Sequence, residues 1–224
     1  MRKLYFAIVT AMLLVSFSAS AQFVQSGNGP AASSDMEKVF NTAEFSYSPT
    51  TLKYDIEGYG SSLDLNAVSL KWAQYRLLTP QLPIYLQYGA GLQYTWKSTK
   101  FDGENISLHL LTLDIPVNVA YNLTIPNTSL AILPYLGLNA QVHLLGKASD
   151  DEISIDLFGD DMEDILEEDG LNRFVLGWQI GAKVCYDRYL FGIGYNGPIT
   201  NVLNIDNEFK INTSQVNISL GIKF

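Results

Sequence analysis

The chain has 224 residues, among them 23 acidic and 14 basic ones, and a formal net charge of −9. Removal of Arg2 and Lys3 with an N-terminal leader would leave 12 basic against 23 acidic residues, about −11, which argues against nucleic acid as a partner. The single cysteine, Cys185, excludes a disulfide within the chain. The length suits one all-β domain.

The first residues have the pattern of a secretory signal peptide. Arg2 and Lys3 precede an apolar run over 4–17, and Ala19-Ser20-Ala21 forms a small-x-small cleavage site. The run is shorter than the roughly 20 apolar residues that a membrane-spanning helix needs. We therefore expect cleavage after Ala21, a flexible periplasmic lead over 22–38, and a folded domain over 39–224.

Eight segments of alternating apolar and polar residues follow, and they predict eight β-strands. Their approximate ranges are 39–48, 63–78, 84–97, 106–122, 130–145, 173–186, 188–196 and 212–224. The second segment is the least regular, so the pattern does not determine its register. Cys185 falls inside the sixth, where we expect it to fill space. Pro116 falls inside the fourth, and because proline removes a sheet donor we expect a β-bulge there.

Alternation alone does not determine which face meets water. The apolar face points inward in a soluble sandwich and outward to lipid in a membrane barrel. The polar faces here are rich in Gly, Asn and Gln, which fit a narrow interior better than a solvated surface. The apolar faces carry aromatic residues near strand ends, as interfacial girdles require: Tyr47, Trp96, Tyr121, Phe174, Tyr186, Tyr189 and Tyr195. These features favour the membrane arrangement.

The connections between the predicted strands alternate in length. Those at 79–83, 123–129 and 187–188 are short, whereas those at about 49–62, 98–105, 146–172 and 197–211 are longer. Short periplasmic turns and longer outer loops are typical of outer-membrane barrels, and an even strand count places both termini in the periplasm. The sequence thus predicts an eight-stranded antiparallel up-and-down transmembrane β-barrel.

Several segments carry a resemblance to a known group. They are Ala19-Ser20-Ala21 followed by Gln22, the run Leu-Thr-Leu-Asp-Ile-Pro-Val at 111–117, the Gly-rich third, sixth and seventh strands, and the terminal Phe224. On these residues the chain resembles the small outer-membrane barrels of Bacteroidetes, the PorT-like and OmpA-like barrel group, over about 39–224. The resemblance implies a place in the cell outer membrane and contact with its lipid and lipopolysaccharide. It also implies recognition by the barrel-assembly machinery through the strand ending in Phe224, and an extracellular or envelope protein partner.

Charged residues on the polar faces predict a plugged lumen. An eight-stranded barrel is just wide enough for side chains to fill, and buried charges must pair. A narrow ion path is the alternative. The expected inward charges are Glu44, Lys71, Arg76, Asp114, Lys183 and Lys223.

The connection at 146–172 is strongly acidic. Calcium binds clusters of carboxylate oxygens, but the spacing matches no EF-hand loop, so we expect a solvated outer loop, with ion binding or a protein partner as alternatives. Met162, Ile165 and Leu166 have helical spacing, which fits a short amphipathic helix over 160–168. The carboxylates are Asp150, Asp151, Glu152, Asp156, Asp160, Asp161, Glu163, Asp164, Glu167, Glu168 and Asp169.

Catalytic and metal-binding patterns have little support. His109 and His143 have no further ligands in register, so we expect both to pack in the lumen. Neither lies beside a nucleophile with an acid partner, and the nearest serines are Ser107 and Ser149. We therefore expect no enzymatic activity, no cofactor, and no catalytic, cofactor-binding or metal site.

Three functions follow as hypotheses. The first is a structural or adhesive barrel, or an accessory to an envelope or secretion complex. The second is a small pore or hydrophobic-ligand carrier of the OmpW-like type, which requires an apolar cavity inside the barrel. The third is a soluble periplasmic lipocalin-like barrel, which fails if Trp96, Trp178 and Phe191 contact detergent.

Overall fold

The computed structural model describes residues 37–56, 59–101, 104–150, 154–159, 171–205 and 209–224. Glu37–Phe224 forms one compact unit. The leader expected over 1–21, and the lead expected over 22–38 except its last two residues, lie outside the described residues. Among the residues that are described, no helix is long and apolar enough to cross a membrane.

The described residues form strands joined by turns. The strands are β1 (Val39–Tyr47), β2 (Thr50–Ile56), β3 (Tyr59–Thr79), β4 (Leu82–Phe101), β5 (Glu104–Tyr121), β6 (Leu123–Thr124), β7 (Leu130–Ser149), β8 (Ser154–Asp156), β9 (Phe174–Tyr186), β10 (Tyr189–Pro198), β11 (Leu203–Ile205) and β12 (Phe209–Lys223).

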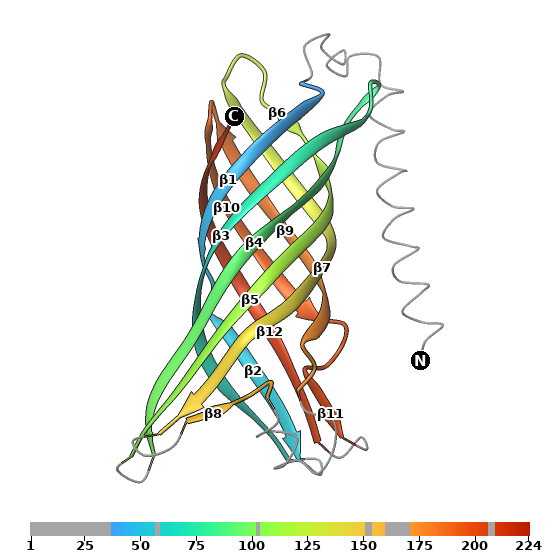
Figure 1. Cartoon of the computed structure of the whole chain (residues 1–224). Helices are drawn as coiled ribbons and strands as arrows, with labels where there is room; N and C mark the ends of the chain where they lie inside the picture. The colour runs from blue at the N-terminus through green and yellow to red at the C-terminus, as the bar shows by residue number, and fades with distance from the viewer. Residues whose placement is uncertain (1–36, 57–58, 102–103, 151–153, 160–170, 206–208) are drawn as a thin grey trace. The chain divides into compact units, whose positions relative to one another are not determined.

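Eight long strands close into a ring (Figure 1). Their order is β1, β12, β10, β9, β7, β5, β4 and β3, and β3 pairs with β1 to complete the ring. β2 continues β1 past Ser48 and Pro49, since both strands pair with β12 on one side and β3 on the other. All these pairings are antiparallel, so the predicted eight-stranded barrel is confirmed.

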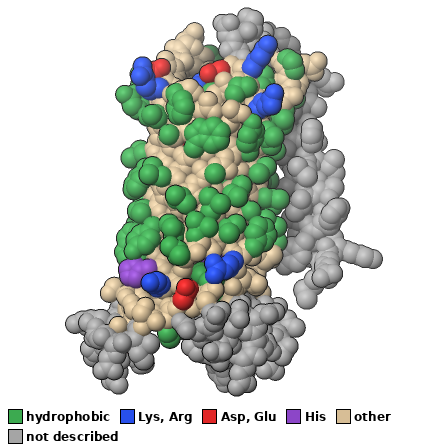
Figure 2. All heavy atoms as spheres, viewed as in Figure 1, with side chains coloured by type: hydrophobic (Ala, Val, Ile, Leu, Met, Phe, Trp, Pro, Cys, Tyr) green, Lys and Arg blue, Asp and Glu red, His purple; other side chains and the backbone are tan. Residues whose placement is uncertain are grey.

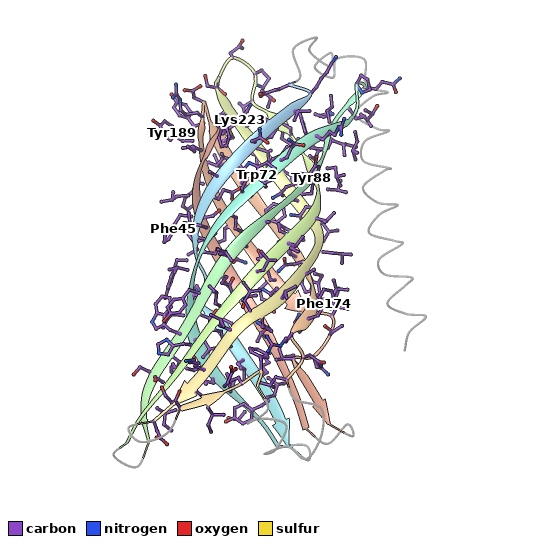
Figure 3. The ribbon with its side chains drawn as sticks, in the orientation of Figure 1. Phe45, Trp72, Tyr88, Phe174, Tyr189 and Lys223 are labelled. Carbon is purple, nitrogen blue, oxygen red and sulfur yellow. The ribbon has the colours of Figure 1, made fainter. Side chains whose placement is uncertain are left out.

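The barrel is apolar outside and polar inside, as the alternation predicts. Leu70 and Phe191 are 67% and 52% exposed on the outer face, whereas Asp114 is 1% exposed within. Hydrophobic side chains form a broad band around the visible wall (Figure 2). Trp72 and Tyr189 lie on this outer face and are 45% and 62% exposed (Figure 3). This is the surface distribution of transmembrane barrels rather than of soluble ones.

The two ends of the barrel differ. The termini end is where β1 begins and β12 ends; its turns are short, as predicted, and lie between β3 and β4, between β5 and β7, and between β9 and β10. In the tightest of them Asp187 adopts a positive φ of 54°. The opposite end, called the hairpin end, holds the remaining connections (Figure 1).

The prediction of longer loops at the hairpin end is wrong over much of their length. Most of 49–62 and 98–105 is strand, because β2 and β3 extend to Ile56 and Tyr59, and β4 and β5 extend to Phe101 and Glu104. β7 runs on to Ser149, and β8 and β11 lie within the other two predicted loops. Backbone pairing continues here because it does not depend on which face of the strand is apolar.

In these extensions the apolar residues lie on the inner face of the strand instead of the outer face. On β3, Leu70 points outward, whereas Leu65 points inward and is 3% exposed. Leu63 lies on the same face as Leu65 and pairs across the sheet with Leu52 of β2. A strand section that meets water on its outer side buries its apolar residues inside instead. This inversion explains why the second predicted segment looked irregular.

The β-bulge expected at Pro116 is absent. The pairs on either side of Pro116 stay in one register with β4, and Pro116 itself pairs in step with Asn139 of β7. The irregularity lies instead between Leu111 and Thr112 of β5, where Leu144 of β7 is an extra residue. A proline removes one donor without adding a residue, so the sheet can tolerate it without a shift of register.

Candidate functional site

The barrel interior is the candidate functional site, and its termini end is filled by apolar side chains. The rings of Phe40 and Tyr75 stack 4.5 Å apart, and Tyr85 meets Phe40 edge-on at 5.4 Å. This apolar plug consists of Phe40, Ala73, Tyr75, Tyr85, Ala120, Leu133, Cys185 and Leu190, all at most 8% exposed. The filler role expected for Cys185 is confirmed. We expected a plugged polar lumen; at this level the plug is apolar instead.

Residues at the opening of the termini end, called the mouth, hold the apolar plug in place. The Tyr85 hydroxyl donates to the Glu37 carbonyl at 2.9 Å. Lys223 Nζ lies 2.5 Å from Glu37 Oε2 and 4.6 Å from the centre of the Phe40 ring. Lys223 therefore closes the mouth rather than crossing the lumen, and its side chain is 28% exposed.

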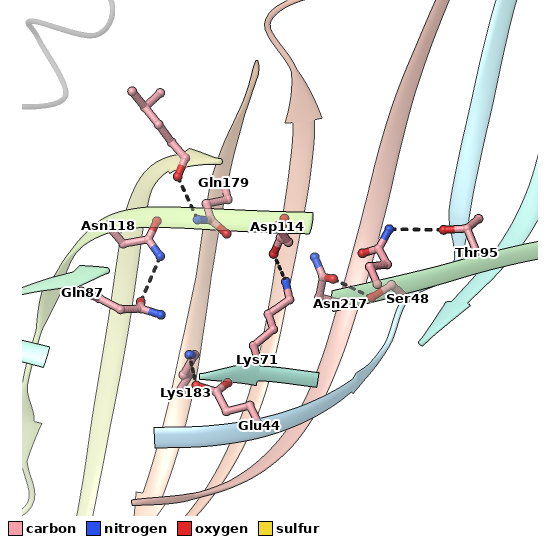
Figure 4. Close-up of polar contacts among 12 residues, drawn as sticks. Glu44, Ser48, Lys71, Gln87, Thr95, Asp114, Asn118, Gln179, Lys183 and Asn217 are labelled. Atoms are coloured by element: carbon pink, nitrogen blue, oxygen red, sulfur yellow. Dashed lines mark hydrogen bonds and ion pairs between the residues drawn. The ribbon is translucent and has the colours of Figure 1, made fainter. Parts of the chain in front are cut away.

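Two buried ion pairs lie deeper in the barrel (Figure 4). Lys183 Nζ lies 2.6 Å from Glu44 Oε1, and Lys71 Nζ lies 2.7 Å from Asp114 Oδ2. Among the described residues, neither oxygen of Asp114 has an aligned hydrogen-bond partner. Charge attraction needs no such alignment, so Lys71 and Asp114 form an ion pair at this distance. The pairing expected for these four inward charges is confirmed.

Lys183 is held by more than its carboxylate partner. Its ammonium donates to the Tyr75 hydroxyl at 2.9 Å and lies 5.6 and 5.4 Å from the ring centres of Tyr75 and Tyr135. Thr42 donates to Glu44 Oε1 at 3.0 Å. These contacts compensate the loss of hydration that a fully buried charge suffers.

Inward glycines make room for the large inward side chains. A Cβ on Gly181 or Gly194 would overlap the hydroxyl of Tyr135, which leans from β7 over the neighbouring strands β9 and β10. A Cβ on Gly91 would meet Lys71 Cγ at 2.6 Å, and one on Gly221 would meet Glu44 Cγ at the same distance. The Gly-rich strands therefore complement the plugged interior, because each missing side chain is replaced by a neighbour's.

Amide and hydroxyl side chains line the interior from the apolar plug toward the hairpin end. Asn118 donates to Gln87 at 2.9 Å, Gln93 to Thr95 at 3.3 Å, and Ser48 to Asn217 at 2.6 Å (Figure 4). Several buried atoms have no partner among the described residues: Ser69 Oγ, Gln93 Oε1, Asn118 Oδ1, Asn139 Oδ1, Asn196 Nδ2 and Gln215 Oε1. Ordered water usually satisfies such groups, so we expect this part of the lumen to be hydrated.

An aromatic contact lies on the inner face toward the hairpin end. Phe158 stacks on His143 with ring centres 5.4 Å apart, and Gly146 leaves space for its ring. Arg173 Nη2 donates to the Phe158 carbonyl at 2.6 Å, with the guanidinium 5.4 Å from the Phe158 ring. Thr112 bonds His143 Nδ1 at 2.9 Å. The inward packing expected for His143 is confirmed.

Two residues expected inside lie outside. Arg76 is exposed and shares the outward face of β3 with Trp72 and Leu78, so its assignment to the lumen is wrong. The undetermined register of the second predicted strand is the reason. His109 is also exposed on the outer face, where Nδ1 lies 2.7 Å from the Tyr94 hydroxyl. Its expected lumen packing is therefore wrong too.

Candidate catalytic groups are not brought together. Ser107 and Ser149 bond each other at 2.8 Å, away from His143, which bonds Thr112. Within the part of the chain that the structure describes, no three His, Cys, Asp or Glu residues are placed to hold a metal ion. The amphipathic helix expected over 160–168, and most carboxylates of the acidic connection, lie outside the described residues.

Solved structures with a similar fold are bacterial outer-membrane β-barrel proteins. Ail, the attachment invasion locus protein of Yersinia pestis in complex with sucrose octasulfate, has 10% identity and a TM-score of 0.46, and the match covers 84% of this chain and 100% of that one. Neisserial surface protein A has 15% identity and a TM-score of 0.37, with 84% and 96% covered. A major outer membrane protein from Thermus thermophilus has 13% identity and a TM-score of 0.40, with 80% and 99% covered.

These likenesses are too distant to support an argument about role. No protein-family model matches the chain. No curated protein matches its sequence.

Proposed function

We propose that the chain is an integral outer-membrane β-barrel with a plugged lumen. It would be structural or adhesive, or an accessory to an envelope or secretion complex, and act through its hairpin end. The observation that carries this proposal is the closed ring with an apolar outer band and ion pairs within. Soluble monomers rarely expose continuous apolar patches beyond a few hundred Å².

The orientation follows from the two ends of the barrel. Short turns and both strand termini favour a periplasmic termini end, and the hairpin end would then face outside. Cleavage after Ala21 would leave the lead in the periplasm. The exposed Phe224, at the end of the strand that closes the ring with β1, is where we expect the assembly machinery to engage.

A plug rather than a pore is supported by the packing inside. The apolar plug fills the termini end, and the charges next to it are paired at 2.6 and 2.7 Å. We therefore infer that the barrel does not conduct ions. The function then lies on surfaces, and the strands that extend at the hairpin end are the part best placed to meet a protein partner.

Membership of the PorT-like and OmpA-like group of Bacteroidetes is part of the same proposal. It rests on the segments that carry the resemblance, above all residues 111–117 and Phe224. An accessory role in secretion is an analogy at the level of fold.

One observation favours the hydrophobic-ligand carrier as a second candidate. The inverted strand sections place Leu52, Leu63 and Leu110 on the inner face at the hairpin end, where they are only half-buried. An apolar ligand would find matching side chains there. Between these leucines and the termini end, the amide, hydroxyl and charged side chains and then the apolar plug fill the interior, so no apolar route runs through the barrel.

Cell fractionation followed by gel analysis of unheated and boiled samples tests the proposal. We expect the chain in the outer-membrane fraction, with a band whose mobility changes on heating because closed barrels resist SDS. A soluble periplasmic chain without this shift would overturn the proposal. Reconstitution in planar bilayers then tests the plug, and a steady conductance would support the pore alternative.

A further inference from the structure

Three side chains form a row on the outer wall toward the hairpin end. Trp96 of β4 pairs with His109 of β5, and His109 pairs with Lys147 of β7. Cross-strand partners share one face of a sheet with Cβ atoms about 5 Å apart, so the row spans about 10 Å. We call these three residues the donor row. Figure 2 shows a histidine and Lys or Arg side chains at the lower border of the hydrophobic band.

The β-bulge is what turns Lys147 outward. His143 points inward, and simple alternation along β7 would point residue 147 inward too. The extra residue Leu144 shifts the phase, so that Gly146 is buried and Lys147 is exposed. The bulge thus places a cation beside His109 on the outer wall.

The donor row offers hydrogen-bond donors and one positive charge. The indole of Trp96 is a donor only, and the ammonium of Lys147 has three donors. The Tyr94 hydroxyl lies 2.7 Å from His109 Nδ1; a hydroxyl that donates there leaves the imidazole proton on Nε2, as a third donor. A phosphate group, which is anionic and accepts hydrogen bonds, matches this set.

Lys147 has no ion-pair partner among the residues that the structure describes. The β8 residue opposite it is Asp156, whose Oδ1 accepts a hydrogen bond from the Phe158 amide at 3.0 Å.

Apolar residues beside the donor row favour a lipid over a soluble anion as its ligand. The next outward row toward the apolar band is Tyr94, Leu111 and Leu145, of which Tyr94 and Leu145 are 43% and 59% exposed. A ligand at the donor row would therefore have its charged group beside Lys147 and acyl chains beside these residues.

We propose that the donor row binds the phosphate of an anionic glycolipid in the outer leaflet. This inference rests on the proposed function, because it needs the hairpin end to face outside. Lys147 supplies the charge, His109 and Trp96 supply directed donors, and Tyr94 orients the imidazole. The site would fix the depth and rotation of the barrel in the membrane.

Native mass spectrometry of the detergent-extracted full mature chain tests this site. The probes are lipid A with two phosphates and the same lipid after removal of both. We expect the wild-type chain to prefer the phosphorylated probe and Lys147→Ala to weaken its binding about fivefold, as for one basic residue at a membrane surface. We expect Trp96→Phe, which keeps an aromatic ring but loses the indole N–H, to weaken binding less, and Lys147→Arg to retain binding.

Lys53→Ala is the matched control, since Lys53 is exposed on β2 and outside the donor row. Equal binding by wild type, Lys147→Ala and Lys53→Ala would overturn the inference, as would equal binding of the two probes. Competition by millimolar inorganic phosphate would identify a site for soluble anions and overturn the lipid assignment. The heat-dependent gel shift separates the two proposals. If the wild-type chain shows no shift, the barrel proposal fails. If the shift is present but the variants bind lipid A as well as wild type does, only the donor-row proposal fails.

Discussion

Replacing Glu44 by alanine leaves the Lys183 ammonium buried without its carboxylate. The two side chains are 6% and 7% exposed and 2.6 Å apart, so solvent screens the pair little. Loss of one partner of a buried ion pair costs about 3–5 kcal/mol. The Tyr75 hydroxyl at 2.9 Å and the rings of Tyr75 and Tyr135 still stabilise the cation, each ring by about 1 kcal/mol. We therefore expect the free energy of unfolding to fall by about 3 kcal/mol, near the lower limit.

Urea titration of the barrel refolded in detergent measures this loss, with tryptophan fluorescence and the unheated gel band as two readouts. Thr42→Ala is the control, because it removes only the 3.0 Å hydrogen bond to Glu44 and should cost about 1 kcal/mol. The double variant Glu44→Ala with Lys183→Met removes both charges and should recover most of the loss. A loss below about 0.5 kcal/mol for Glu44→Ala, or a double variant less stable than Glu44→Ala, would refute the argument from buried charge.

Three further predictions follow from the packing. Gly194→Ala should cost about 1–3 kcal/mol of unfolding free energy by overlap with the Tyr135 hydroxyl, and far less in a Tyr135→Phe background; equal cost in both backgrounds would contradict the overlap. Phe40→Ala combined with Tyr85→Ala should produce single-channel conductance in planar bilayers that wild type lacks, because the apolar plug loses two of its three rings; silence of a folded double variant would mean that the ion pairs seal the lumen alone. Leu70→Arg should cost about 2–4 kcal/mol in lipid, because it places a charge on the outer apolar face; a cost near zero would contradict lipid contact at that position.

The donor row shows how a single extra residue changes what a strand presents. Without the bulge, regular alternation from His143 through Leu144 would direct Lys147 into the lumen. With the bulge, the same lysine stands on the outer wall beside His109. Bulges often re-aim side chains in this way at the rims of barrels.

The architecture, and the face of each residue on most strands, can be predicted from the amino-acid sequence alone. A period of two needs no knowledge of the rest of the chain, because each residue's face depends only on its neighbours along the strand. This local rule correctly predicts the outward faces of β4, β5, β9, β10 and β12. It also predicts the inward positions of Glu44, Lys71, Asp114 and Lys183.

Which side chains contact one another depends on the folded barrel. Glu44 and Lys183 are 139 positions apart, and closure of the ring is what brings them to 2.6 Å. The fit of Tyr135 over Gly181 and Gly194 also depends on which strands are neighbours and in what register. Neither distance nor register is contained in a local pattern.

The same limit explains the errors. The lumen assignment of Arg76 is wrong because the register of its irregular segment is undetermined: the large apolar side chain lies outside at Trp72 but inside at Tyr75, and a periodic pattern cannot reveal this change. The bulge at Leu144 was missed because it depends on pairing between β5 and β7 rather than on either sequence. Local periodicity therefore determines which face of a strand each residue occupies. The ion-pair partners, the apolar plug and the donor row depend on the closed barrel, because their contacts exist only after distant strands have paired.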